Sequence, residues 1–285
     1  MNTQPKLEFI QLAKELTRST NIDDIIDAAR KLEGYLDEED DGGFDLPDTA
    51  SEFLEQCMIW TTKGQTMLKL HEYQKSWLDW LDDNQNASTS RDPEIMIAAR
   101  QMGVSTVFPL YGLFYGVANP WSRVMIVTPR TASSIEHCDR VRIAIDGMGI
   151  GVKSSNRFQI VLENGSEITF ANQHDVDRYR GQNIVILLDA SFYPYSQDDN
   201  MKRFVYRQLA DGGRVVIATA SRYRGGFVHD YIRDNVPYIA TTWDEHPDRE
   251  AGWSDTIRKQ LSEDQWRMEM ECSFISHPDE YIRKK

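Results

Sequence analysis

The chain has 285 residues, of which 40% are hydrophobic, and a formal net charge of −13 at pH 7. This composition supports a large core and excludes a protein that coats nucleic acid with its whole surface, because phosphate binding depends on Lys and Arg. The sequence has no apolar run long enough to span a bilayer, no signal-peptide core, and no Cys or His spacing typical of disulfides or zinc, so we expect a soluble intracellular protein.

The N-terminal residues predict two short helices followed by a linker. Apolar side chains recur with helical spacing in two runs, separated by the capping sequence "STN", which predicts a helical hairpin over residues 1–36. Residues 37–49, "DEEDDGGFDLPDT", predict a solvated acidic linker, with a partner-docking tail as the alternative. Residues 1–66 hold 15 acidic and 6 basic side chains, so any contact with double-stranded DNA must be local, for example through "RYRGQN" or "ASRYRGG".

The rest of the chain alternates between helix-like and strand-like patterns. A helix, a short hairpin around Gly64 and the amphipathic segment "LKLHEYQKSWLDWL" come first. Strand-like runs then follow, several of them continuously apolar: "EIMIAA", "RVMIVTP", "FQIVL", "EITFAN", "NIVILLD" and "RVVIAT". Continuous runs are typical of strands buried on both faces, which predicts an α/β fold with a mostly parallel central sheet flanked by helices. Asn164-Gly165 predicts a hairpin within this series, and residues 247–274 predict one or two helices.

The sequence "EIMIAARQMGVSTV" has the layout of a phosphate-binding loop between a strand and a helix. The pattern G-x-x-x-x-G-K-[ST] places glycines at the first and sixth positions, a lysine next and then a hydroxyl. Here those positions hold Ala98, Gly103, Val104 and Ser105. Taken alone, an ordinary strand-turn-helix explains this stretch equally well.

Two further strand ends carry candidate functional residues. The run "NIVILLDAS" ends in Asp189, where nucleotide hydrolases place the aspartate that helps hold Mg²⁺, but Ala190 stands where a catalytic glutamate is common. The run "RVVIATAS" ends in the small hydroxylic residues Thr219 and Ser221. The carboxyl ends of parallel strands meet at one edge of a sheet, so three such ends in this order predict a single site.

These motifs, with "NGSEITFAN", "RYRGQNIVILLDASFYP" and the closing "GWSDTIRKQLSEDQWRMEMECSF", give the chain a family resemblance. Residues 50–275 resemble the ATPase domain of tailed-phage terminase large subunits, the P-loop NTPase-like motors that package DNA into proheads. The most specific features are the Arg-Gln-x-Gly loop and the Arg-Gly pair before the acidic strand. With the hairpin and the linker, the chain is therefore expected to have four segments, the third being the ATPase domain over 50–275 and the fourth a tail over 276–285.

The resemblance also implies ATP and Mg²⁺ as cofactors, with roles for individual residues. Gln74 corresponds to an adenine-reading glutamine, Arg100 to an arginine acting in cis on the γ-phosphate, and Ser105 with Asp189 to the metal ligands. The segment that couples hydrolysis to domain movement corresponds to Thr219, Ala220 and Ser221. The remaining contacts to ATP are expected from the loop and first helical turn: Gln101, Met102, Gly103, Val104 and Thr106. Each assignment has an alternative explanation. Gln74 can be a solvent-facing residue at the start of a helix, Arg100 can form a surface salt bridge, and Ser105 can cap its helix. Residues 219–221 can simply be small for packing.

Both Walker motifs are degenerate, and this predicts weak or absent ATP hydrolysis. No lysine occurs in residues 92–103 to replace the one missing at Val104. A lysine about 4 Å from a phosphate oxygen contributes on the order of 4 kcal/mol at an effective dielectric near 20. Losing one such preorganised donor costs about 10²–10³ in rate, and the absence of a glutamate at Ala190 removes the group that orients the attacking water.

The expected partners are a phage portal, a small terminase or active motor subunits, with no membrane association, in the cytoplasm of an infected bacterial host. We expect no DNA cleavage, because no carboxylate cluster of the family's nuclease domain follows the ATPase domain before Lys285. Three alternatives to a naturally impaired motor stay open. These are a pseudo-ATPase scaffold or regulatory subunit, an engineered catalytically dead motor domain, and a helicase-like translocase.

Overall fold

The computed structural model describes residues 25, 26, 28, 45–85, 92–250 and 252–276. Contacts between Cα atoms divide the chain into residues 1–45 and 46–285. In the first unit Ile25, Ile26, Ala28 and Asp45 are described, and the first three of these are helical. Most of the expected helical hairpin, linker and tail therefore lies outside the described residues. Among the described helices, none combines the length and apolar character needed to cross a membrane.

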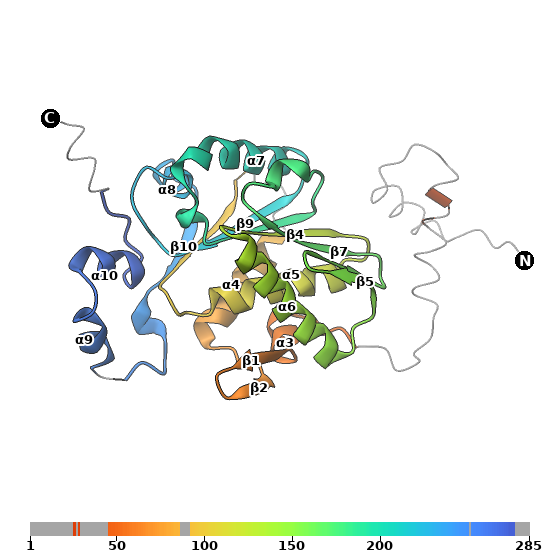
Figure 1. Cartoon of the computed structure of the whole chain (residues 1–285), viewed down its shortest axis with the longest axis horizontal. Helices are drawn as coiled ribbons and strands as arrows, with labels where there is room; N and C mark the ends of the chain where they lie inside the picture. Colours follow the sequence, from red (N-terminus) through yellow and green to blue (C-terminus); the bar gives the residue numbers. More distant parts are fainter. Residues whose placement is uncertain (1–24, 27, 29–44, 86–91, 251, 277–285) are drawn as a thin grey trace, which may run out of the picture. The chain divides into compact units, whose positions relative to one another are not determined.

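An eight-stranded sheet forms the centre of the second unit, with the strand order β10-β3-β9-β8-β4-β7-β6-β5 (Figure 1). Its strands are β3 (Glu94–Ala98), β4 (Arg123–Thr128), β5 (Val152–Asn156), β6 (Gln159–Leu162), β7 (Glu167–Asn172), β8 (Ile184–Leu188), β9 (Arg214–Thr219) and β10 (Tyr238–Thr241). The strands from β10 to β7 pair in parallel, and β6 and β5 pair antiparallel at one edge. The mostly parallel sheet expected from the apolar runs is confirmed.

Helices precede, connect and follow these strands. The α-helices are α3 (Ala50–Glu55), α4 (Glu72–Gln85), α5 (Val104–Ala118), α6 (Thr131–Met148), α7 (Asp198–Ala210), α8 (Phe227–Arg233), α9 (Trp253–Arg258) and α10 (Glu263–Glu269). The 3-10 turns are η1 (Val176–Arg178), η2 (Ala190–Phe192), η3 (Tyr195–Gln197) and η4 (Trp243–Glu245). A separate antiparallel pair, β1 (Met58–Thr61) and β2 (Gly64–Met67), forms the hairpin expected around Gly64.

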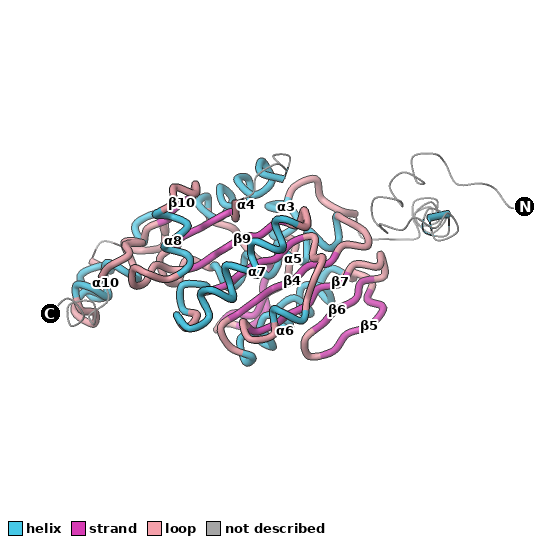
Figure 2. The backbone as a smooth tube through the Cα atoms, turned by 90° about the horizontal axis from the view of Figure 1, so that it is seen from above, coloured by secondary structure: helices cyan, strands magenta, loops and turns pink. Residues whose placement is uncertain are grey.

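The sheet is buried between two layers of helices. Figure 1 shows α7 and α8 on one face and α4, α5 and α6 on the other, and the view from above shows α7 and α8 lying over the strands (Figure 2). All five residues of β8 are buried, as the continuous apolar run predicts. A Cβ at Gly112 of α5 would lie 3.1 Å from the Ile126 side chain, so a glycine there allows the helix to approach the sheet closely.

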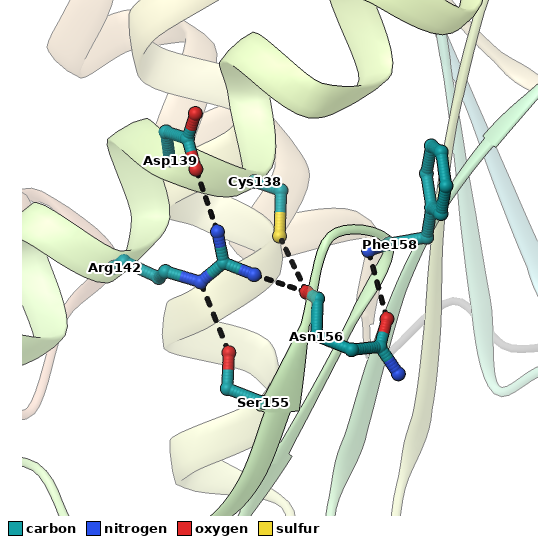
Figure 3. Close-up of polar contacts among 6 residues, drawn as sticks. All are labelled: Cys138, Asp139, Arg142, Ser155, Asn156 and Phe158. Carbon is teal, nitrogen blue, oxygen red and sulfur yellow. Dashed lines mark hydrogen bonds and ion pairs between the residues drawn. The ribbon is translucent and has the colours of Figure 1, made fainter.

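The antiparallel edge of the sheet is fastened to α6 by polar contacts around Arg142 (Figure 3). Its guanidinium donates to Asp139 Oδ1 at 2.6 Å, to Ser155 Oγ at 3.0 Å and to the carbonyl of Asn156. The Asn156 side chain accepts from the N–H of Phe158 at 2.9 Å and so shapes the turn between β5 and β6. These contacts keep the hairpin attached although most of β5 is exposed.

The strand order brings three predicted strand ends to one place. The chain passes from β3 through α5 to β4, returns later to β8 and β9, and β9 lies between β3 and β8. In parallel sheets, ligands bind at the carboxyl edge where successive connections diverge in opposite directions. The connections from β3 and β9 diverge here, toward β4 and toward β10, and the predicted residues of the three strand ends follow this edge.

Candidate functional site

The segment from Ala99 to Gly103 forms a tight loop whose backbone N–H groups are in part free. The N–H of Ala99 donates to the Thr241 carbonyl at 2.9 Å, and that of Arg100 donates to the Glu269 carbonyl at 2.8 Å. Gln101 and Gly103 adopt positive φ angles of 63° and 90°. Within the described residues, the N–H groups of residues 101–105 donate to no protein atom. Together with the N-terminus of the 15-residue helix α5, they offer a group of hydrogen-bond donors suited to an anion.

The start of α4 supports this loop from behind. Gln74 is buried, and its Nε2 donates to the Met102 carbonyl at 2.9 Å while its Oε1 accepts from the His71 N–H at 3.0 Å. The hydroxyl of Tyr73 donates to the same Met102 carbonyl at 3.1 Å. The structure thus places Gln74 against the loop and uses both ends of its amide to hold the loop's shape.

Asp189 follows β8 and adopts a left-handed backbone conformation. Its φ is 51°, in the left-handed region that non-glycine residues rarely adopt, and its N–H donates to the Ala218 carbonyl of β9 at 3.0 Å. Burial raises the pKa of its carboxyl above the ordinary value, and the nearby positive charge of Arg100 lowers it in part. The predicted loop arginine and the predicted metal-binding aspartate are therefore neighbours.

Arg100 is held between a carboxylate and an aromatic ring. Its Nε lies 3.6 Å from Glu269 Oε2 on α10, and its guanidinium carbon lies 4.8 Å from the centroid of the Phe192 ring. Arg222 contacts the same ring, at 5.2 Å. The guanidinium of Arg100 is half-exposed, so it is available to an anion while being oriented by its neighbours.

A second cation, which we did not single out from the sequence, reaches the first turn of α5. Arg140 of α6 donates to the Ser105 carbonyl at 3.0 Å and to Thr106 Oγ1 at 3.2 Å, and it pairs with Glu136 at 2.6 Å. The hydroxyl of Thr106 is therefore occupied as an acceptor. Only the chain fold brings Arg140 here, 35 residues beyond Ser105, so local sequence carries no signal for it.

The expected coupling segment is buried and is tied to the C-terminal helices. Ser191 N–H donates to Thr219 Oγ1 at 3.1 Å, which links the end of β9 to the turn after Asp189. Ser221 Oγ donates to the Met268 carbonyl at 2.6 Å. Because Glu269 also contacts Arg100, α10 touches both the loop and the coupling segment.

The two positions that depart from the nucleotide-hydrolase pattern differ in their surroundings. Val104 is the first residue of α5 and is partly exposed, with no charge to offer. Ala190 is 1% exposed and belongs to the core cluster that includes Val127 and Tyr193. A carboxylate at residue 190 would be buried among apolar side chains, so the two losses are not equivalent.

A family model described as terminase large subunit, T4likevirus-type, N-terminal, matches residues 95–285. No curated protein matches the chain by sequence.

Solved structures share the fold at low sequence identity. The ATPase domain of the large terminase of Thermus phage P74-26 is 18% identical with a TM-score of 0.54, over 73% of this chain and 94% of that chain. The large terminase of bacteriophage HK97 is 11% identical with a TM-score of 0.58, over 83% of this chain and 50% of that chain. A large terminase from a thermophilic bacteriophage, in complex with ADP, is 10% identical with a TM-score of 0.56, over 72% and 54%. The chain thus spans about half the length of these two longer proteins.

Proposed function

The chain belongs to the terminase large subunit family, T4likevirus-type, N-terminal, and from this membership we propose that its ATPase domain binds the phosphates of ATP at residues 98–106 but hydrolyses ATP weakly or not at all. The free N–H groups of residues 101–105 carry the proposal. They supply phosphate-binding donors without requiring a lysine. The thermophilic-phage relative in complex with ADP supports nucleotide binding by this fold.

The residues that we assign to the metal fit Mg²⁺. Ser105 and Asp189 offer a hydroxyl and a carboxylate oxygen, which are the ligand types that Mg²⁺ accepts in nucleotide sites. Burial raises the pKa of Asp189, so a bound cation would offset the cost of its charge. Mg²⁺ would supply charge neutralisation at the phosphates, while Arg100 and the N–H groups position them.

Two absent groups limit hydrolysis. Val104 leaves the phosphates without a lysine, and Arg100 shares its charge with Glu269. Ala190 offers nothing to orient a water, and its side chain is buried in the core. Losing one preorganised donor costs about 10²–10³ in rate, and the missing general base adds about 10²–10⁴.

The proposal is tested by titrating the chain with a fluorescent ATP analogue in the presence of Mg²⁺. We expect weak saturable binding, and we expect Val104→Lys to tighten it at least tenfold, because an ammonium near a phosphate contributes on the order of 4 kcal/mol before desolvation. Val104→Met is the matched control, since it adds length without charge. Binding that is absent in both the parent chain and the lysine variant would contradict the proposal.

The second candidate function is a pseudo-ATPase that binds an active motor subunit, a portal or a small terminase. The contacts of α10 with both Arg100 and Ser221 favour it, because a segment that links both parts of the site can report its occupancy to a partner. Double-stranded DNA remains a proposed partner through Arg180 and Arg222 with their flanking basic residues. An infected bacterial cytoplasm is the proposed location.

A further inference from the structure

The structure brings together two imidazoles and a carboxylate that lie far apart in the sequence. His71 immediately precedes α4, and His246 and Asp248 lie in the loop that follows η4. One potential ligand atom from each residue falls within 4.8 Å of the other two. We propose that His71, His246 and Asp248 bind one divalent transition-metal ion of the Zn²⁺ class. This proposal does not depend on nucleotide binding by the loop.

The donor set selects the class of metal. Two imidazole nitrogens with one carboxylate oxygen are a common protein contribution to zinc and related sites, in which water completes the coordination. Mg²⁺ and Ca²⁺ prefer oxygen ligands throughout, so they fit this site poorly. Sequence spacing gave no sign of it, because His71 and His246 are 175 positions apart and neither lies in an H-x-x-x-H pattern.

Both imidazoles are positioned by their surroundings. The ring centroids of His71 and His246 lie 4.6 Å apart, and the Tyr73 ring contacts both, at 5.5 and 5.9 Å. The backbone of His71 is fixed by the Gln74 side chain and by the first turn of α4. A capping box between Thr242 and Glu245 orders the turn before His246. Two of the three ligands are thus held close together before any ion binds.

The three ligand atoms must move closer together to bind one ion, and the exposed side chain of Asp248 can make most of this movement. His71 Nε2 lies 3.9 Å from Asp248 Oδ2, and the Asp248 side chain is 76% exposed and free to rotate. With metal–ligand bonds of about 2.0–2.2 Å, the ligand atoms must approach one another to roughly 3.5 Å. Binding also costs the hydrogen bond that His246 Nδ1 accepts from the Asp248 N–H at 3.2 Å, because the metal or a proton must occupy that nitrogen. The required movements are therefore small and local.

The full chain, freed of any histidine tag and stripped with a chelator, is titrated with Co²⁺ and then with Zn²⁺. Visible d–d absorption of bound Co²⁺ reports nitrogen and oxygen coordination, and its loss on adding Zn²⁺ gives the relative affinity. We expect one ion per chain, and we expect His71→Gln, His246→Gln and Asp248→Asn each to weaken binding by at least about tenfold. The matched control is His174→Gln, because His174 is exposed and lies outside the cluster.

Thermal unfolding of each variant without metal shows whether it folds, so a folding defect is not mistaken for a lost ligand. Zn²⁺ should raise the melting temperature of the parent chain and of His174→Gln but not of Asp248→Asn. The proposal is overturned if the parent chain binds no Co²⁺ or Zn²⁺. It is equally overturned if the three cluster variants bind as the parent does, since the ion would then lie elsewhere.

Discussion

Gly103 has a φ of 90°, and a Cβ there would lie 2.3 Å from Gln74 Nε2. We predict that Gly103→Ala lowers the free energy of unfolding by about 2–4 kcal/mol, through backbone strain and the loss of hydrogen bonds made by Gln74. Nucleotide affinity should fall with it, because the N–H groups of the loop lose their arrangement. Urea unfolding and the fluorescent titration measure the two effects.

Gly225 provides the control for this change. Its φ is 93°, and a Cβ there meets nothing within 4 Å, so Gly225→Ala carries the backbone strain alone. We expect it to cost about 1–2 kcal/mol and to leave nucleotide affinity unchanged. Equal costs at the two glycines would show that Gln74 does not constrain the loop.

Glu269 is the residue whose replacement best tests how Arg100 is used. We predict that Glu269→Gln tightens nucleotide binding about fivefold, because it removes a negative charge beside the phosphates and releases Arg100 from its ion pair, a change of about 1 kcal/mol. Equilibrium titration with Mg²⁺ and the analogue measures it. Glu263→Gln is the control, since Glu263 lies on the same helix and pairs with Arg258 at the surface. Weaker nucleotide binding by Glu269→Gln would contradict this prediction, because it would mean that the ion pair holds Arg100 in the orientation that binds the phosphates.

The predicted site residues came from three strand-end motifs and from Gln74 in "HEYQ", and the structure brings the three strand ends to one sheet edge, with Gln74 against the loop. Their assigned roles stay predictions, because no ligand distance tests them. The sequence did not reveal Arg140, Glu269 or the ring of Phe192, since each reaches the loop only through tertiary packing. The His71–His246 pair was missed for the same reason.

At the level of elements, the partly buried ion pair between Arg214 and Glu94 joins β9 to β3. Arg214 donates to both carboxylate oxygens at 2.9 and 2.8 Å and also to the Leu81 carbonyl and the Tyr111 hydroxyl. We predict that Arg214→Met destabilises the fold by about 2–4 kcal/mol, because it leaves Glu94 partly buried and without this partner. Urea unfolding measures this.

The comparison for that change is Arg233→Met, which removes an exposed pairing partner of Asp230 and should cost less than about 1 kcal/mol. Arg214 lies at the amino end of β9, opposite the loop, so nucleotide affinity should be unaffected in both variants. Similar stability losses in the two variants would contradict the prediction that the Arg214–Glu94 pair contributes more to stability than the exposed Arg233–Asp230 pair.

Strands were predictable where burial on both faces required an apolar run. The six runs that we read as strands all form strands of the large sheet, and Asn164-Gly165 forms the expected hairpin turn. The sequence did not indicate β5 or β10. The first, "VKSSN", is mostly exposed at the sheet edge, and the second is a four-residue strand with partial exposure. Neither has the hydrophobic pattern that burial imposes.

At the level of the whole molecule, the division between Asp45 and Leu46 predicts that residues 46–285 fold on their own. We expect this fragment to keep the melting temperature of the full chain within about 3 °C, because residues 46–285 form a compact unit by themselves. Differential scanning calorimetry of both proteins measures it. A fragment that fails to unfold cooperatively would show that residues 1–45 form part of the folded domain.

The most direct measurement of the central claim is phosphate release by the intact chain at a Mg²⁺-ATP concentration shown by titration to saturate the site. We predict saturable binding together with a release rate indistinguishable from the protein-free blank. Turnover near the roughly 1–10³ s⁻¹ of ordinary enzymes would contradict the account, because it would mean that hydrolysis proceeds with Val104 and Ala190 in place.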